Sequence, residues 1–166
     1  MSTTTQRMIG ERKFLTFLLD NYKKDILDGF KFTNENSIWE MFEEGYVQIE
    51  SILENAISKI GHIERNSINR MDFVDGSDSK KCTLSKEKKG NNTRYYYRIT
   101  NAYTKVGKLR IMGWNWKADR FEFFVIPKFV YQGLKHVKIS VDNQTFIPVG
   151  KYSKWQVNSF EAMCCL

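Results

Sequence analysis

Apolar side chains in the first 60 residues recur at the three- and four-residue spacing of a helix face. The segment 8–28 carries this pattern and Gly29 follows it as a stop signal, so we expect one helix there. A second helix is expected over 37–60, because Ser37 and Glu40 have the spacing of a capping box. The part of the chain up to about residue 62 is therefore predicted to be helical.

From about residue 69 to the end, the pattern changes to that of short strands. Aromatic and β-branched residues are concentrated in four runs, at 94–100, 108–112, 120–126 and 137–141. No helix pattern separates these runs, which favours antiparallel neighbours. A chain of 166 residues suits one domain. We therefore predict a single α+β domain over 1–166, with N-terminal helices followed by a mixed, mostly antiparallel sheet.

The sequence argues against several classes of protein. No apolar run approaches the roughly 20 residues that cross a bilayer, and the N-terminus lacks the layout of a secretory signal, so no membrane contact and a cytoplasmic location are expected. The three cysteines, Cys82, Cys164 and Cys165, have neither disulfide-framework nor zinc-site spacing. Two histidines do not suit mechanisms that need several imidazoles, and no phosphate-loop or dinucleotide motif occurs.

Charge is distributed unevenly along the chain. Residues 1–78 hold 9 basic and 14 acidic residues, whereas residues 79–166 hold 17 basic and 5 acidic residues. A basic region of this kind attracts polyanions, and nucleic acid is the usual partner. The candidate contacts to nucleic acid are Lys81, Lys86, Lys88, Lys89, Arg94, Arg98, Lys105, Lys108, Arg110, Asn115, Lys117 and Arg120.

Three carboxylates stand immediately before this basic half, and a lysine follows them. Asp72, Asp75 and Asp78 lie within seven residues, and Asp78 stands two positions before Lys80. Alternate residues of a strand share a face, so Asp78 and Lys80 point the same way if a strand has begun there. Asp72 joins them across a three-residue hairpin loop, or through a longer irregular connection, but not across a two-residue Asp75-Gly76 turn.

Convergence of these side chains would favour phosphodiester hydrolysis. Two neighbouring carboxylates repel each other unless a cation lies between them, and their hard oxygens suit Mg²⁺. The ion can activate a water molecule, while the ammonium group of Lys80 offsets negative charge that develops on the phosphate. The alternative is an acidic hairpin tip that is merely exposed to solvent.

The order of these features resembles the PD-(D/E)xK nuclease superfamily, which includes restriction and homing endonucleases. The resemblance implies an α/β restriction-endonuclease-like core and Mg²⁺-dependent cleavage of DNA. It assigns the second acid and the lysine to Asp78 and Lys80, and the first acid to Asp72 or Asp75, although no proline precedes either residue. It also implies a metal-binding glutamate on the preceding helix, for which Glu50 is the candidate, beside Asp72 and Asp78.

These observations lead to a specific functional expectation. The chain is expected to be a Mg²⁺-dependent endonuclease of restriction or homing type that cuts duplex DNA as a homodimer, since two active sites suit a symmetric target. A basic nucleic-acid-binding module without catalysis is the first alternative. A basic protein that assembles with an acidic protein partner is the second.

Overall fold

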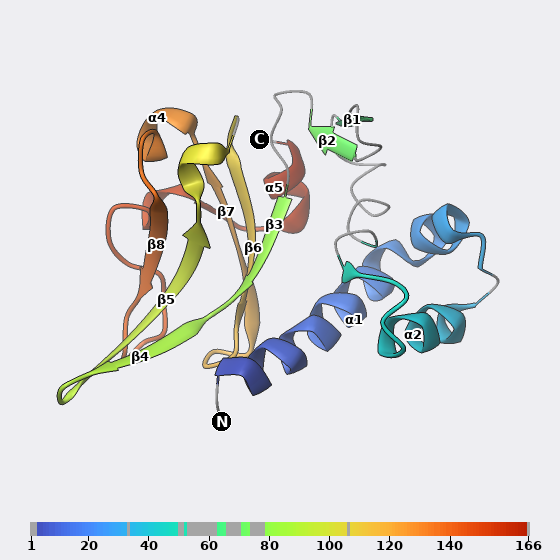
Figure 1. The fold of residues 1–166 in the computed structure, drawn as a ribbon, viewed down its shortest axis with the longest axis horizontal. Helices are drawn as coiled ribbons and strands as arrows, with labels where there is room; N and C mark the ends of the chain where they lie inside the picture. Colours follow the sequence, from blue (N-terminus) through green and yellow to red (C-terminus); the bar gives the residue numbers. More distant parts are fainter. Residues whose placement is uncertain are drawn as a thin grey trace.

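The computed structural model describes residues 3–32, 34–49, 52, 63–65, 71–73, 79–105 and 107–165. Helices occupy the N-terminal part and mixed, mostly antiparallel sheets follow them, which confirms the predicted α+β class (Figure 1). Short helical elements connect or follow the strands: η1 (Ala102–Thr104), α4 (Lys128–Tyr131), η2 (Ser153–Trp155) and α5 (Phe160–Cys165).

Helix α1 (Thr3–Phe30) forms because its apolar residues follow the predicted helical spacing. Phe14, Leu15 and Leu18 lie on the face of the helix that packs against the central sheet, and they are almost completely buried. The helix begins earlier than predicted and continues past Gly29. Tyr22 leaves the helical conformation, with φ −135°, and its hydroxyl group donates a hydrogen bond to Glu161 in α5.

Helix α2 (Glu35–Glu43) differs from the predicted helix over 37–60 at its start and in its continuity. The N-cap is Asn34, whose Oδ1 accepts a hydrogen bond from the backbone N–H of Ser37 at 3.1 Å, so Ser37 lies in the first turn and is not the cap. The helix ends at Glu43, and Gly45 turns the chain with φ +81°. The side-chain amide oxygen of Asn34 therefore caps the helix, and the capping box expected from Ser37 and Glu40 does not.

Among the described residues, the strands form two larger sheets and one small one. The central sheet has the order β3 (Ser79–Thr83), β6 (Leu109–Asn115), β7 (Arg120–Ile126) and β9 (Gln156–Val157). The outer sheet has the order β4 (Ser85–Lys89), β5 (Asn92–Thr100) and β8 (His136–Val141), and a third sheet pairs β1 (Ile63–Arg65) with β2 (Met71–Phe73). All pairs are antiparallel except β3 with β6.

The chain passes from the central sheet to the outer sheet at a single residue. Leu84 separates β3 from β4 and donates its backbone N–H to the carbonyl oxygen of Trp114 at 2.9 Å. Beyond this point β4 pairs with β5, while β3 pairs with β6. As a result, β3 and β5 diverge from each other towards the end of the domain that holds η1 (Figure 1).

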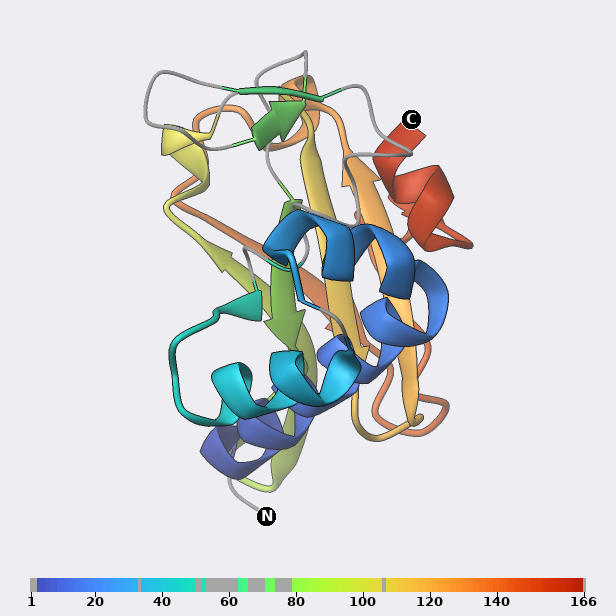
Figure 2. The same cartoon turned by 90° about the vertical axis from the view of Figure 1, so that its right-hand side faces the viewer.

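Alternation along β6 separates two hydrophobic cores. Leu109 and Ile111 belong to the core between the two larger sheets, whereas Met112 and Trp114 belong to the core beneath the helices. Helices α1 and α2 lie in front of the central sheet and α5 lies beside them (Figure 2). The central sheet is therefore covered on both faces, which explains why every residue of β6 is buried.

Candidate functional site

Lys80 lies in β3 on the side of the central sheet that faces the outer sheet. Its register partner in β6 is Ile111, a member of the core between the sheets, and residues paired across a sheet share a face. Cys82, two residues further along, packs against the same core. Lys80 is half-buried on this side of the sheet.

Lys81 points to the opposite side of the same strand, towards the helices. Its Nζ lies 2.8 Å from Oε1 of Glu11 in α1, and the Lys81 side chain is only 16% exposed. This ammonium group was expected to contact nucleic acid, but in the structure it stabilises the contact between α1 and β3. Adjacent lysines therefore have different surroundings because strand side chains alternate.

The acidic candidates are only partly within the described residues. Asp72 lies in β2, where its register partner is Glu64 in β1, and the described part of Asp72 is its backbone. Asp75, Asp78 and Glu50 lie outside the described residues. The strand of Asp72 pairs with β1, and the strand of Lys80 pairs with β6, so β2 and β3 do not form the hairpin considered from the sequence.

The predicted nucleic-acid contacts fall into three groups by exposure. Arg110 and Asn115 are buried, and Lys81, Lys105 and Lys108 are half-buried. The exposed members are Lys86, Lys88, Lys89, Arg94, Arg98, Lys117 and Arg120. Only this last group is exposed to solvent, so the basic surface is smaller than the charge pattern suggests.

The two buried members have structural roles that exclude the predicted contact. Nη1 of Arg110 donates to the backbone oxygen of Met163 at 2.6 Å and thereby anchors α5 to β6. Nδ2 of Asn115 donates to Glu122 Oε1 at 2.9 Å and to the backbone oxygen of Phe146 at 3.0 Å, while its Oδ1 accepts from Ala118 N at 3.0 Å. Neither side chain is available to a base or a phosphate in this structure.

Lys117 is exposed, and its ammonium group lies near three aromatic rings. Its Nζ lies 5.0 Å from the ring centroid of Phe146 and 5.8 Å from those of Tyr95 and Trp116. Cation–π attraction fixes an exposed lysine only weakly. Lys117 therefore remains accessible to an anion, from a position set by the β6–β7 turn.

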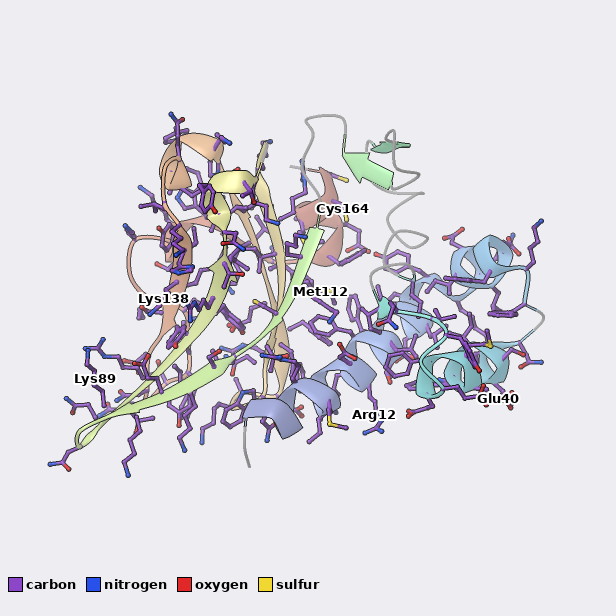
Figure 3. The ribbon with its side chains drawn as sticks, in the orientation of Figure 1. Arg12, Glu40, Lys89, Met112, Lys138 and Cys164 are labelled. Carbon is purple, nitrogen blue, oxygen red and sulfur yellow. The ribbon has the colours of Figure 1, made fainter. Side chains whose placement is uncertain are left out.

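Sequence reasoning missed the contribution of β8 to the exposed basic surface. Val137, Ile139 and Val141 are buried between the sheets, whereas Lys138 and Ser140 are exposed on the other face of the strand. The polar–apolar alternation of 136–141 was the available signal, since it assigns Lys138 to the solvent side. Figure 3 shows Lys138 on this side of β8 and Lys89 at the far end of β4.

Comparisons of the chain with family models, curated proteins and solved structures found no match. Among the described residues, no helix is both long and apolar enough to span a bilayer.

Proposed function

We propose that this protein is a Mg²⁺-dependent endonuclease that hydrolyses phosphodiester bonds of duplex DNA as a homodimer. The observation that carries the proposal is that the Asp78-Ser79-Lys80 sequence leads into β3, where Lys80 is half-buried on the inter-sheet side. Residues two apart in an extended segment face the same way. A carboxylate and an ammonium group on one side of a strand are the elements that the proposed chemistry needs.

The metal ligands in this proposal are carboxylates of Asp78 and Asp72, with Asp75 as the other candidate for the first acid and Glu50 as a third ligand. Carboxylate oxygens are suitable ligands for Mg²⁺. Within the part of the chain that the structure describes, no three His, Cys, Asp or Glu residues are grouped to hold a metal ion. The proposed ligand set therefore depends on Asp75, Asp78 and Glu50, which lie outside that part of the chain.

Each residue has a distinct role in the proposed reaction. Asp78 and the first acid hold the ion and orient the scissile phosphate beside it. When bound, Mg²⁺ supplies positive charge to the phosphate and promotes deprotonation of a water molecule. Lys80 donates hydrogen bonds to a non-bridging phosphate oxygen, and its half-buried position reduces solvent screening of that charge.

Cleavage of long duplex DNA tests this proposal. We expect the wild-type protein to give fragments with Mg²⁺ and none with EDTA, and Asp78→Ala and Lys80→Ala to cleave at least about 100-fold more slowly. Lys81→Gln is the matched control, because it removes a neighbouring charge on the helix side of β3. Full cleavage by a pure Asp78→Ala protein would contradict the proposal.

A nucleic-acid-binding module without catalysis is a second candidate, and the exposed cations of the outer sheet favour it. Arg94, Arg98 and Lys138 are all exposed on strands that contain a single carboxylate, that of Glu87. Such a module would retain DNA in EDTA and would not nick it when Mg²⁺ is added. The same cleavage assay therefore separates the two candidates.

A further inference from the structure

The outer sheet presents one face to the core and leaves the other face to solvent. Register pairs Glu87 with Arg94, Tyr96 with Ser140, and Arg98 with Lys138, so these six side chains share the solvent face. The opposite face contains the buried residues of β5 and β8. Helices α1, α2 and α5 lie on the far side of the central sheet and do not cover this face (Figure 1).

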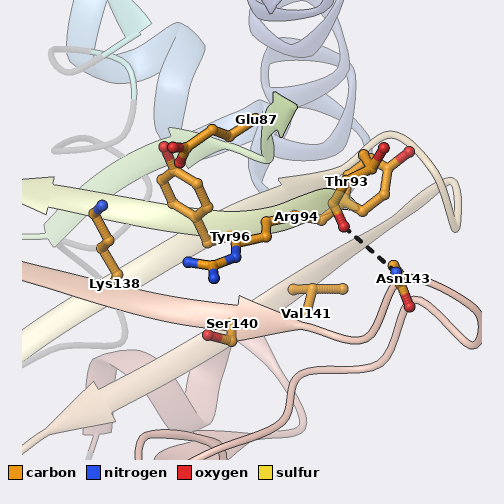
Figure 4. Close-up of a pocket in the computed structure, with 9 residues that line it drawn as sticks. Glu87, Thr93, Arg94, Tyr96, Lys138, Ser140, Val141 and Asn143 are labelled. Carbon is orange, nitrogen blue, oxygen red and sulfur yellow. Dashed lines mark hydrogen bonds between the residues drawn. The ribbon is translucent and has the colours of Figure 1, made fainter. Parts of the chain in front are cut away.

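Positive charge predominates on this solvent face. Arg94, Arg98 and Lys138 are exposed, and Lys89 follows on the same side of β4. The carboxylate of Glu87 neighbours the Tyr96 hydroxyl group (Figure 4), and burial together with this neighbour raises the pKa of Tyr96. Four cations against one carboxylate make the face complementary to a polyanion.

A groove of about 350 Å³ crosses this face between β5 and β8 (Figure 4). Its lining includes the hydrogen-bond donors of Arg94, Lys138, Ser140 and Asn143, and these outnumber the single carboxylate in the lining, that of Glu87. Lys138 Nζ lies 5.0 Å from the ring centroid of Tyr96, which places the ammonium group over the groove wall. Such a groove suits a phosphate and its sugar, because cations and hydroxyl groups recognise phosphate oxygens.

The outer sheet also extends beyond its third strand as a two-stranded ribbon. Pairing with β8 begins at Tyr95, whereas β4 and β5 stay paired from there to Lys89 and Asn92. Residues 87–94 therefore form a ribbon that is closed by Gly90, with φ +64°, and that points away from the helices (Figure 3). Lys88 and Lys89 alternate along β4, so both faces of this ribbon are cationic.

We propose that the solvent face of the outer sheet and the 87–94 ribbon form the DNA-docking surface. The ribbon enters a DNA groove, and a backbone phosphate occupies the groove between Arg94 and Lys138. The major groove of B-DNA is about 12 Å wide and admits a two-stranded β-ribbon. This inference rests on the proposed function only for the choice of DNA as the partner, because docking itself requires no metal ion.

Binding measured in EDTA tests the docking surface separately from catalysis. A fluorescein-labelled DNA duplex is titrated with protein at several salt concentrations, and anisotropy gives the Kd. We expect Arg94→Ala/Lys138→Ala to bind roughly 60-fold more weakly at about 0.1 M salt and to lower the salt slope by about 1.8, since each lost phosphate contact removes about 0.9.

The matched control is Lys23→Ala/Lys24→Ala, which removes the same charge from exposed positions on α1. It should leave the salt slope unchanged. Lys88→Ala/Lys89→Ala should also weaken binding, because it removes cations from the ribbon. Equal losses in the α1 control, or wild-type affinity in Arg94→Ala/Lys138→Ala, would overturn the docking surface.

Two further measurements keep the outcomes distinct. Amide chemical shifts should change in β5 and β8 when the duplex is added to wild-type protein, and shifts confined to the helices would contradict the proposal. Binding to anionic phospholipid vesicles that exceeds binding to DNA would also overturn it. If the protein docks DNA through this face but never cleaves it, only the endonuclease proposal is wrong. If the protein cleaves DNA but Arg94→Ala/Lys138→Ala binds normally, only the docking surface is wrong.

Discussion

The hydroxyl group of Tyr97 in β5 donates a hydrogen bond to Oε1 of Glu122 in β7 at 2.6 Å, which joins the outer sheet to the central sheet inside the core. Asn115 donates to the same oxygen, and Nε of Arg120 donates to Oε2 at 3.3 Å. The Glu122 side chain is only 2% exposed. A buried carboxylate is tolerated here because donors satisfy both of its oxygens.

Replacing Tyr97 by phenylalanine should destabilise the fold. The substitution leaves the ring in the core but removes one donor from the buried carboxylate, which should lower the free energy of unfolding by about 1–3 kcal/mol. Urea denaturation followed by tryptophan fluorescence measures this loss. Tyr95→Phe is the matched control, because Tyr95 lies on the same strand face outside this network, and its effect should stay within about 0.5 kcal/mol. Equal losses in both variants would contradict the role of Glu122.

The same contact predicts how stability responds to alkaline pH. Burial and the neighbouring Glu122 raise the pKa of Tyr97 well above its usual value. Above pH of about 10 the unfolded chain loses this proton while the folded protein keeps it, so the stability that is fully present below that pH falls as pH rises. Tyr97→Phe should lose stability less steeply than wild type, by up to about 1.4 kcal/mol per pH unit. Identical slopes between pH 9.5 and 11 would exclude this contribution.

The three thiols should differ in reactivity. Burial raises the pKa of Cys82 and of Cys164 to about 12, whereas Cys165 is exposed. Only the thiolate reacts with disulfide reagents. At pH 8 we expect one fast thiol per folded chain and three after denaturation, measured with an aromatic disulfide reagent. Cys165→Ser should remove the fast phase, and a fast phase that persists in this variant would show that Cys82 or Cys164 is accessible.

Local sequence patterns predicted the strands that their own runs of aromatic and β-branched residues identify. Strand β7 occupies 120–126 as predicted, and β5 and β8 differ from the predicted runs only at their first residues. Strand β6 continues past the predicted end at residue 112 because Gly113 fits there: a Cβ at this position would lie 2.7 Å from the ring of Tyr97. A glycine that permits close packing looks like a strand end in the sequence.

Elements that depend on distant partners were harder to predict. Strands β3 and β4 have the polar sequence 79–89, and parallel pairing with β6 holds the first of them in place. The buried positions of Arg110 and Asn115 likewise depend on partners 53 and 31 residues away. Charge and spacing alone could not separate these side chains from exposed cations. They did, however, place the basic surface on the sheet region.

His136 should make DNA binding depend on pH if the outer sheet is the docking face. Burial lowers its pKa, and the nearby cations Arg98, Lys135 and Lys138 lower it further. Arg98 Nη2 lies 3.2 Å from His136 Nε2. A guanidinium group can only donate, so Nε2 accepts in this contact and carries no proton there.

Phosphates bound near His136 would offset the repulsion from these cations and raise the pKa of the imidazole. Binding would then take up a proton between the lowered and the raised pKa, so affinity should increase as pH falls through that window, by at most about tenfold per pH unit. Anisotropy titrations in EDTA at constant ionic strength, from pH 8 to 5.5, measure this dependence. His136→Gln should bind with a flatter pH profile and nearly wild-type affinity at pH 8. A profile as steep as that of wild type would show that DNA does not reach β8, because no other residue of β8 titrates in this range.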